Sequence, residues 1–302
     1  VGEELDDEDA AFIRKNAFRS AEDDRKFIDC FWYSVAFECD AIFELRMEFY
    51  EKYPELLEQI YIEKEKNDQK LCRRKIRLLE VCLKNKKSLH TDEWFQQDDE
   101  IDRENAIYAA RQLIKYLPEG KAWEIRYGDW SERKISEYTC QRTAVDLLKK
   151  AFKTMALKDS EEFWNVCKIY MKAESLVKNE IILYGLCFLP EEHSDQIMEY
   201  LALAPEENCR EYTSGECNEL NYAKDILKKC TAHCTDHVLE TFEEKVANYC
   251  PADIVRQYKW RKERKGYWPV WGELQYELLP CIPEERQSSK CHDLLNVLNR
   301  RF

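Results

Sequence analysis

The sequence predicts an all-α protein built from two disulfide-stapled helical domains. Its 302 residues include only 7 glycines and 8 prolines, too few for the turns that the short strands of a sandwich or barrel need. Apolar residues recur at helical spacing along most of the chain. The 14 cysteines are even in number and scattered singly, a pattern typical of disulfides formed in an oxidising compartment.

A chain of this length with 44% hydrophobic residues suggests two domains rather than one or three. Residues 118–130 hold two glycines, a proline and two tryptophans, and we place the domain boundary there. The N-terminal helical domain is then 1–118, and the cysteine-rich C-terminal helical domain is 119–302. The two domains hold 4 and 10 cysteines, both even numbers, so each can close its own disulfides. The predicted disulfide cysteines are Cys30, Cys39, Cys72, Cys82, Cys140, Cys167, Cys187, Cys209, Cys217, Cys230, Cys234, Cys250, Cys281 and Cys291.

Five helices are expected in the N-terminal domain. An acidic start, a capping-box pair formed by Ser20 and Asp23, and a first-turn proline at Pro54 mark the beginnings of the first three. Apolar residues at helical spacing mark the last two. The expected helices cover about residues 3–18, 20–39, 54–61, 71–83 and 106–117.

Seven helices are expected in the C-terminal domain. Ser131 and Ser160 are expected to cap the first two, and Pro190 and Pro251 to open two of the others. The expected helices cover about residues 131–155, 160–170, 175–188, 191–203, 218–248, a segment from 251, and 288–298.

The helix expected from Asn218 to Asn248 is the organising element of this domain. If Cys230 and Cys234 are oxidised, each ties this helix to a different neighbour, because cysteines one turn apart reach outward to other segments. One side of the helix must face inward, since five of its residues follow one another at spacings of 3, 4, 3 and 4. These residues are Leu220, Ala223, Leu227, Cys230 and Cys234.

The net charge of −13 and the pI near 5.1 argue against duplex nucleic acid as the main partner, because phosphate binding requires a basic surface. The longest apolar run, Ile181 to Leu189, is about half of the roughly 20 residues that a transmembrane helix needs. The chain starts at Val1 with an acidic stretch and without signal-peptide features, which fits a mature secreted product. We therefore expect an extracellular protein.

Neither catalysis nor a cofactor is expected. The five histidines lie in no recognised catalytic context, and the GxSxG, HExxH and glycine-rich phosphate-loop motifs are absent. Carboxylate pairs are too numerous to single out an acid, a base and a nucleophile together.

Two groups of residues have the types that bind metals. Cys230, His233, Cys234 and His237 could ligate zinc, but along one helix they span about 10 Å, too far for all four to reach one ion. The acidic group from Asp98 to Glu104 alternates carboxylates as calcium loops do, but it lacks the glycine of an EF-hand. We favour disulfides with surface histidines for the first group and a solvated acidic face for the second.

Residues 256–271 are the one place where the acidic chain becomes basic, and tryptophans interrupt the basic run. Such a segment could bind an anionic glycan, an anionic lipid or an acidic protein through charge and flat aromatic contact. Alternatively, the basic residues solvate a helix while the tryptophans pack onto the core. The candidate binding residues are Lys259, Trp260, Lys262, Arg264, Lys265, Trp268 and Trp271.

The cysteine spacing and two short stretches carry family resemblances. The last cysteines, with Cys230 and Cys234 in a C-x3-C, are similar to the pattern of insect odorant-binding proteins and of the D7 salivary proteins, although the first domain lacks that motif. Over its whole length the chain more closely resembles the 34 kDa salivary secreted proteins of culicine mosquitoes, which include the labrum-interacting type. The resemblance is carried by the acidic start running into Asp9-Ala-Ala-Phe-Ile-Arg-Lys-Asn16, by Leu227-Lys-Lys-Cys-Thr-Ala-His-Cys234, and by the length.

This resemblance implies a non-enzymatic protein delivered in saliva during blood feeding. Its partner would be another protein, either a host factor or a cuticular protein of the insect's mouthparts. Two alternatives stay open: a scavenger that holds a biogenic amine or a lipid in a helical pocket, and a binder of anionic glycans through residues 256–271.

Overall fold

The structure, a computed structural model, describes residues 5–20, 22–24, 39–54, 69–85, 100–117, 132–171, 175–203, 218–249 and 272–301. These ranges consist of helices and their connections, and they contain no β-strand. The prediction of an all-α fold is confirmed.

The chain divides into two compact units, Val1–Thr154 and Met155–Phe302, which we call unit 1 and unit 2. The boundary expected at residues 118–130 lies outside the described residues.

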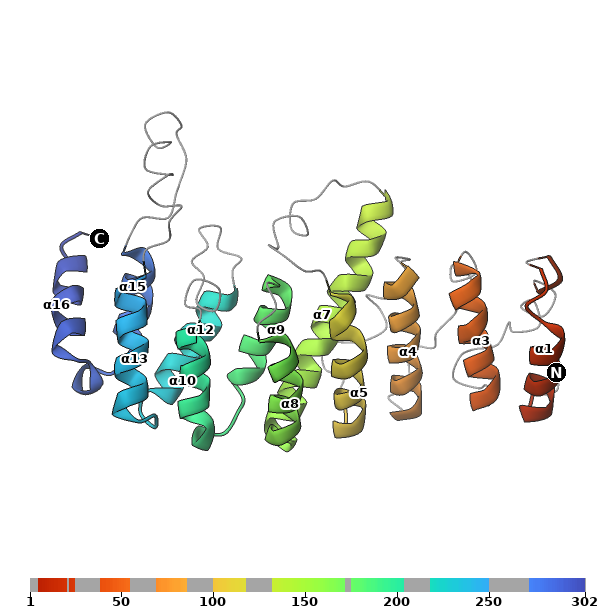
Figure 1. The fold of residues 1–302 in the computed structure, drawn as a ribbon, viewed down its shortest axis with the longest axis horizontal. Helices are drawn as coiled ribbons and strands as arrows, with labels where there is room; N and C mark the ends of the chain where they lie inside the picture. The colour runs from red at the N-terminus through yellow and green to blue at the C-terminus, as the bar shows by residue number, and fades with distance from the viewer. Residues whose placement is uncertain are drawn as a thin grey trace, which may run out of the picture. The chain divides into compact units, whose positions relative to one another are not determined.

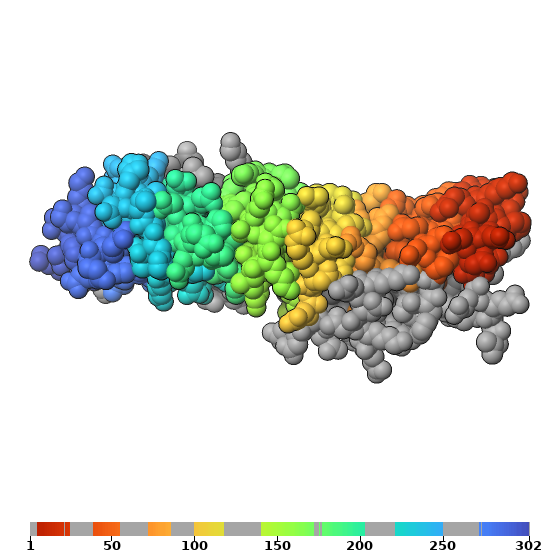
Figure 2. All heavy atoms as spheres, turned by 90° about the horizontal axis from the view of Figure 1, so that it is seen from below, coloured from red at the N-terminus to blue at the C-terminus, as the bar shows by residue number. Residues whose placement is uncertain are grey.

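Unit 1 contains a row of helices, each of which packs against the next along the chain (Figure 1). On the face seen in Figure 2, the side chains of these helices follow one another without a gap. The helices are α1 (Asp7–Asn16), α3 (Asp40–Lys52), α4 (Gln69–Asn85) and α5 (Arg103–Leu113), which continues into the 3-10 turn η3 (Ile114–Tyr116). The long helix α7 (Glu132–Lys158) begins in unit 1.

The N-terminal helix starts and ends for local reasons. Asp6 caps α1 through a reciprocal pair of hydrogen bonds with Asp9, in which each backbone N–H donates to the other side chain. The helix buries Ala10 and Ile13 in an apolar cluster shared with α3. It stops before Phe18, whose φ of 62° lies in the left-handed region that few non-glycine residues adopt.

The buried carboxylate of Asp24 stabilises this unusual backbone. Its side chain accepts a hydrogen bond from the Phe18 N–H at 2.7 Å and another from the Tyr53 hydroxyl at the end of α3. Asp24 itself is fully buried, and the Lys52 ammonium lies 3.7 Å from its second oxygen. The Phe18 ring stacks on Phe49 of α3, with 4.7 Å between the ring centres. The segment after α1 is thereby attached to α3.

One of the two hydrogen bonds of the predicted capping box, from the Asp23 N–H to Ser20, is present just before this carboxylate. The Asp23 N–H donates to the Ser20 hydroxyl at 3.1 Å, and that hydroxyl donates to the Asp23 carboxylate at 2.8 Å. The rest of the helix expected at 20–39, and the helix expected from Pro54, lie largely outside the described residues.

Unit 2 is a second helical assembly, in which α10 lies between α12 and α13 and α12 also packs on α9. The N-cap of α8 is Asp159 rather than the predicted Ser160, because the Asp159 side chain accepts the Glu162 N–H. Its helices are α8 (Ser160–Tyr170), α9 (Leu176–Leu186), α10 (Ser194–Leu203), α12 (Asn218–Cys230), α13 (Asp236–Ala247), α15 (Glu273–Leu278) and α16 (Ser289–Leu298), with 3-10 turns η4 (Glu191–His193), η5 (Leu279–Cys281) and η6 (Glu284–Arg286).

The single helix predicted for residues 218–248 is wrong: α12 ends at Cys230, and α13 begins only at Asp236. Distant side chains hold the intervening turn. The Thr235 N–H donates to the Asp195 carboxylate at 2.7 Å, and the Arg286 guanidinium donates to the Cys234 carbonyl at 2.7 Å.

Residues predicted to face inward along this segment are buried, although the segment is not one helix. Ala223, Leu227, Cys230 and Cys234 are all buried. Helical spacing explains the burial of Ala223, Leu227 and Cys230 on α12, whereas Cys234 is buried within the turn that follows α12.

The predicted disulfides are not seen among the described cysteines. Cys30, Cys209, Cys217 and Cys250 lie outside the described residues, and no disulfide joins any two of the other ten. At two of these cysteines the thiol donates to the backbone carbonyl four residues earlier: Cys187 to Leu183 at 3.3 Å and Cys281 to Glu277 at 3.6 Å. Such thiols behave as small apolar side chains with a weak donor.

Candidate interaction surface

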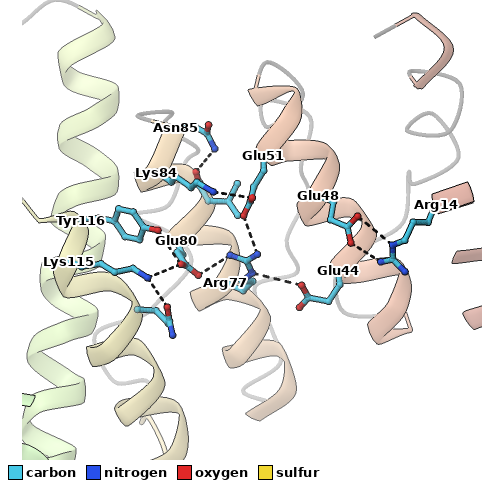
Figure 3. Close-up of polar contacts among 12 residues, drawn as sticks. Arg14, Glu44, Glu48, Glu51, Arg77, Glu80, Lys84, Asn85, Lys115 and Tyr116 are labelled. Carbon is cyan, nitrogen blue, oxygen red and sulfur yellow. Dashed lines mark hydrogen bonds and ion pairs between the residues drawn. The ribbon is translucent and has the colours of Figure 1, made fainter. Parts of the chain in front are cut away.

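Charged side chains of unit 1 form ion pairs that join each helix of the row to the next (Figure 3). We call this set the polar ladder. Its members are Arg14 of α1, Glu44, Glu48 and Glu51 of α3, Arg77, Glu80 and Lys84 of α4, and Lys115 and Tyr116 of η3.

Helical spacing places the ladder residues on one side of each helix. On α3, the three glutamates lie at positions i, i+4 and i+7, and on α4 the three charged residues lie at i, i+3 and i+7. A different side of α3 carries Leu45 and Phe49, which are fully buried. Each helix is therefore amphipathic, with its ladder residues on the polar side.

Arg77 is the centre of the polar ladder. Its guanidinium lies 2.9 Å from Glu80 on its own helix, and 3.2 Å from Glu51 and 3.9 Å from Glu44 on α3. Burial lowers the pKa of Arg77, but the three surrounding carboxylates outweigh burial, so that the pKa is raised above its ordinary value. Arg77 therefore links α3 to α4 through charge-assisted hydrogen bonds.

Two carboxylates complete the centre. The side chain of Glu80 is only 9% exposed, and besides Arg77 it meets Lys115 at 3.4 Å and accepts from the Tyr116 hydroxyl at 3.3 Å. Burial raises the pKa of Glu51, but Lys84 at 3.0 Å and Arg77 lower it more, so that the pKa lies below its ordinary value. Glu51 is therefore held ionised by the two cations of α4.

The outer part of the polar ladder is more accessible. Arg14 of α1 and Glu48 of α3 pair at 2.8 Å, and their side chains are 45% and 46% exposed. The hydrogen bond to Glu48 raises the pKa of Arg14 despite some burial. Glu44 is 55% exposed although it faces Arg77. These side chains are held in place by their partners and still reach solvent.

The arrangement suits recognition by charge. The polar ladder holds four basic and four acidic side chains, all oriented by contacts with one another. A partner with complementary charges would meet groups that are already ordered, which limits the side-chain entropy lost on binding. The sequence analysis did not single out this surface, although the spacing of the glutamates on α3 was a signal that could have found part of it.

The basic and aromatic segment predicted to bind a partner lies outside the part of the chain that the structure describes. Lys259, Trp260, Lys262, Arg264, Lys265, Trp268 and Trp271 all lie outside the described residues.

The two candidate metal groups have other roles where they are described. His233 lies 3.4 Å from Glu191, and Cys234 donates to the Thr231 carbonyl at 3.9 Å. In the acidic group, Asp102 caps α5 by accepting the Asn105 N–H at 2.9 Å. Within the described ranges no three histidine, cysteine or acidic side chains gather as metal ligands would.

The thiols of unit 2 are held in their protonated form. Burial raises the pKa of Cys187 to about 12, and burial together with Glu243 raises that of Cys291 to about 12. Burial also raises the pKa of Cys230 and of Cys234. A cysteine nucleophile needs the opposite shift, because the thiolate is the reactive form.

Comparisons with protein-family models, with curated proteins and with solved structures found no match to this chain. Among the residues that the structure describes, none of the helices combines the length and the apolar character that crossing a membrane requires.

Proposed function

We propose that this chain is a secreted, non-enzymatic interaction protein of the salivary type, and that the polar ladder of unit 1 is its contact surface. Its partner is another protein, either a host factor or a cuticular protein of the insect's mouthparts, met during blood feeding. The resemblance to the 34 kDa salivary proteins suggests the setting, and the polar ladder supports recognition of a protein.

The observation that carries this proposal is the ordering of charged side chains across three successive helices. Charged side chains at the edge of a protein–protein interface speed up the encounter of the two proteins and discriminate between partners more than they add affinity. Unpaired lysines and glutamates would lose conformational freedom on binding, whereas Arg14, Glu48 and Arg77 are already oriented by ion pairs.

The thiols of unit 2 support the non-enzymatic part of the proposal. Burial raises the pKa values of Cys187, Cys230, Cys234 and Cys291 above 9.0, so the thiolate that a cysteine nucleophile needs is scarcer than in an ordinary thiol. Secretion is supported by the resemblance to the 34 kDa salivary proteins.

Affinity capture tests the proposal. The full chain is immobilised and exposed to host plasma and, separately, to an extract of insect mouthparts. The test variant carries Glu44→Lys and Glu48→Lys, which reverse two exposed ladder charges one helical turn apart. The expected result is capture of one defined protein by the native chain and roughly tenfold weaker capture by the variant.

A matched control separates the surface from the net charge. Glu240→Lys and Glu244→Lys make the same charge change at the same spacing on exposed positions of α13 in unit 2. This control is expected to capture the partner as well as the native chain does. Equal loss in both variants, or no loss in either, would remove the polar ladder from the proposal.

The alternatives give different outcomes in the same experiment. A scavenger would capture no protein and would release a stoichiometric amine or lipid on denaturation. A glycan binder would be retained on heparin, and its retention would fall with added salt.

A further inference from the structure

A pair of buried thiols connects α4 to α7 inside unit 1. The side chains of Cys82 and Cys140 form a hydrogen bond with each other, and the two residues are 0% and 2% exposed. The contact joins segments far apart in the sequence, since Cys82 lies on α4 and Cys140 on α7. Cys187 and Cys281 in unit 2 differ, because their thiols donate to backbone carbonyls.

We propose that Cys82 and Cys140 are a disulfide-forming pair that cross-links α4 to α7 when the chain folds in the presence of a low-molecular-weight disulfide such as oxidised glutathione. The structure describes the reduced form of this pair, in which the two sulfurs are neighbours but are not bonded. A disulfide requires its two cysteines to approach from different backbone segments, and the hydrogen bond between Cys82 and Cys140 places their side chains in contact, short of disulfide distance.

The chemistry is a two-step thiol–disulfide exchange. The thiolate of one cysteine attacks a sulfur of oxidised glutathione and expels one glutathione thiolate, which leaves a mixed disulfide on the protein. The second cysteine, as its thiolate, attacks the protein sulfur of that mixed disulfide and expels the second glutathione. The two cysteines lose two electrons and two protons, and two molecules of reduced glutathione gain them.

Burial decides when this exchange takes place. Burial raises the pKa of Cys82 well above its ordinary value, and the neighbouring Cys140 adds to the effect. The reactive thiolate is therefore scarce once α4 and α7 have packed, so the exchange belongs to folding. The finished bond would lie in the core, out of reach of reductants in solution.

The position of Cys82 connects this bond to the polar ladder. Cys82 lies on α4 between Glu80 and Lys84, two ladder residues. A cross-link at this point would fix α4, the helix that carries the central Arg77, to α7. The Cys82–Cys140 disulfide is tested on the pure protein, so the outcome does not depend on the protein partner proposed above.

Mass mapping of the refolded chain tests the pairing directly. The full chain is refolded with reduced and oxidised glutathione, alkylated in denaturant without reductant, and digested. The expected result is a peptide pair joined through Cys82 and Cys140, which separates after reduction. Alkylation of both cysteines, or a bond from either one to a different cysteine, would overturn the proposal.

Two variants extend the test to stability. Cys82→Ala is expected to leave Cys140 open to alkylation, whereas Cys167→Ala, at an equally buried thiol of unit 2, is expected to leave the Cys82–Cys140 bond in place. A bond that closes a loop of roughly 60 residues should raise the Tm of unit 1 by about 10 °C over the reduced form. That difference should vanish in Cys82→Ala and persist in Cys167→Ala, and the opposite pattern would contradict the assignment. If Cys82→Ala does not fold, the map of the native chain still decides.

Discussion

Replacing Asp24 by alanine is expected to lower the free energy of unfolding of unit 1 by about 3 kcal/mol. The carboxylate accepts the Phe18 N–H and the Tyr53 hydroxyl, and it is fully buried. Its removal leaves two donors without their acceptor, and each such loss costs roughly 1–3 kcal/mol. One of these two donors is the N–H of Phe18, whose left-handed backbone the hydrogen bond supports. The alanine variant also no longer has to bury a carboxylate, and this gain offsets part of the cost of the two lost hydrogen bonds.

Two further variants locate the origin of this effect. Asp24→Asn keeps one acceptor oxygen and should cost about half as much as alanine. Asp23→Ala removes a neighbouring carboxylate that is exposed and accepts a hydrogen bond from the Ser20 hydroxyl, and it should cost less than about 1 kcal/mol.

Urea unfolding followed by far-UV circular dichroism measures the stability, and hydrogen exchange reports the Phe18 amide itself. That amide should lose protection in Asp24→Ala and retain it in Asp23→Ala. The reasoning from buried donors would be refuted if the free energy of unfolding of Asp24→Ala lay within about 0.5 kcal/mol of that of the native chain and its Phe18 amide were still protected.

The remaining predictions concern an arginine, a glutamate and two buried thiols. Arg77→Ala should destabilise unit 1 by roughly 1–2 kcal/mol, because Glu80 is then left nearly buried with fewer cations, and an unchanged urea midpoint would contradict this. The pKa of Glu51 is lowered, so its contribution to stability is present above pH 4.5 and is lost as the pH falls through its folded-state pKa. Glu51→Gln should therefore lose less stability than the native chain on acidification. Cys187 and Cys291 have pKa values raised from 9.0 to about 12. In the reduced protein their contribution to the free energy of unfolding is therefore complete below pH 9.0 and declines as the pH rises toward 12. Alanine at either position should flatten this alkaline loss, as measured by urea midpoints across that range.

Local sequence signals predicted several elements well. The apolar spacing expected at 71–83 lies within α4 (Gln69–Asn85), and the segment expected at 106–117 overlaps α5 and η3. The pairing of Ser20 with Asp23 needed nothing beyond four consecutive residues.

The break after Cys230 had no such local signal. The side chains that hold the turn, Asp195 and Arg286, are 40 residues before Thr235 and 52 residues after Cys234. No window of helical spacing contains them. The same limitation applies to Asp24, whose partner Tyr53 lies 29 residues further along the chain.

The sequence by itself determined the helical class and the side of each helix that turns inward, because periodicity is a property of neighbouring residues. Only the tertiary structure decided which polar sides meet, so that the glutamates of α3 face Arg77 of α4. It also decided which thiols are neighbours, and it brought Cys82 of α4 to Cys140 of α7. The physical reason is that spacing places a side chain on a face, whereas the packing of that face against another sets its partner, its burial and its charge state.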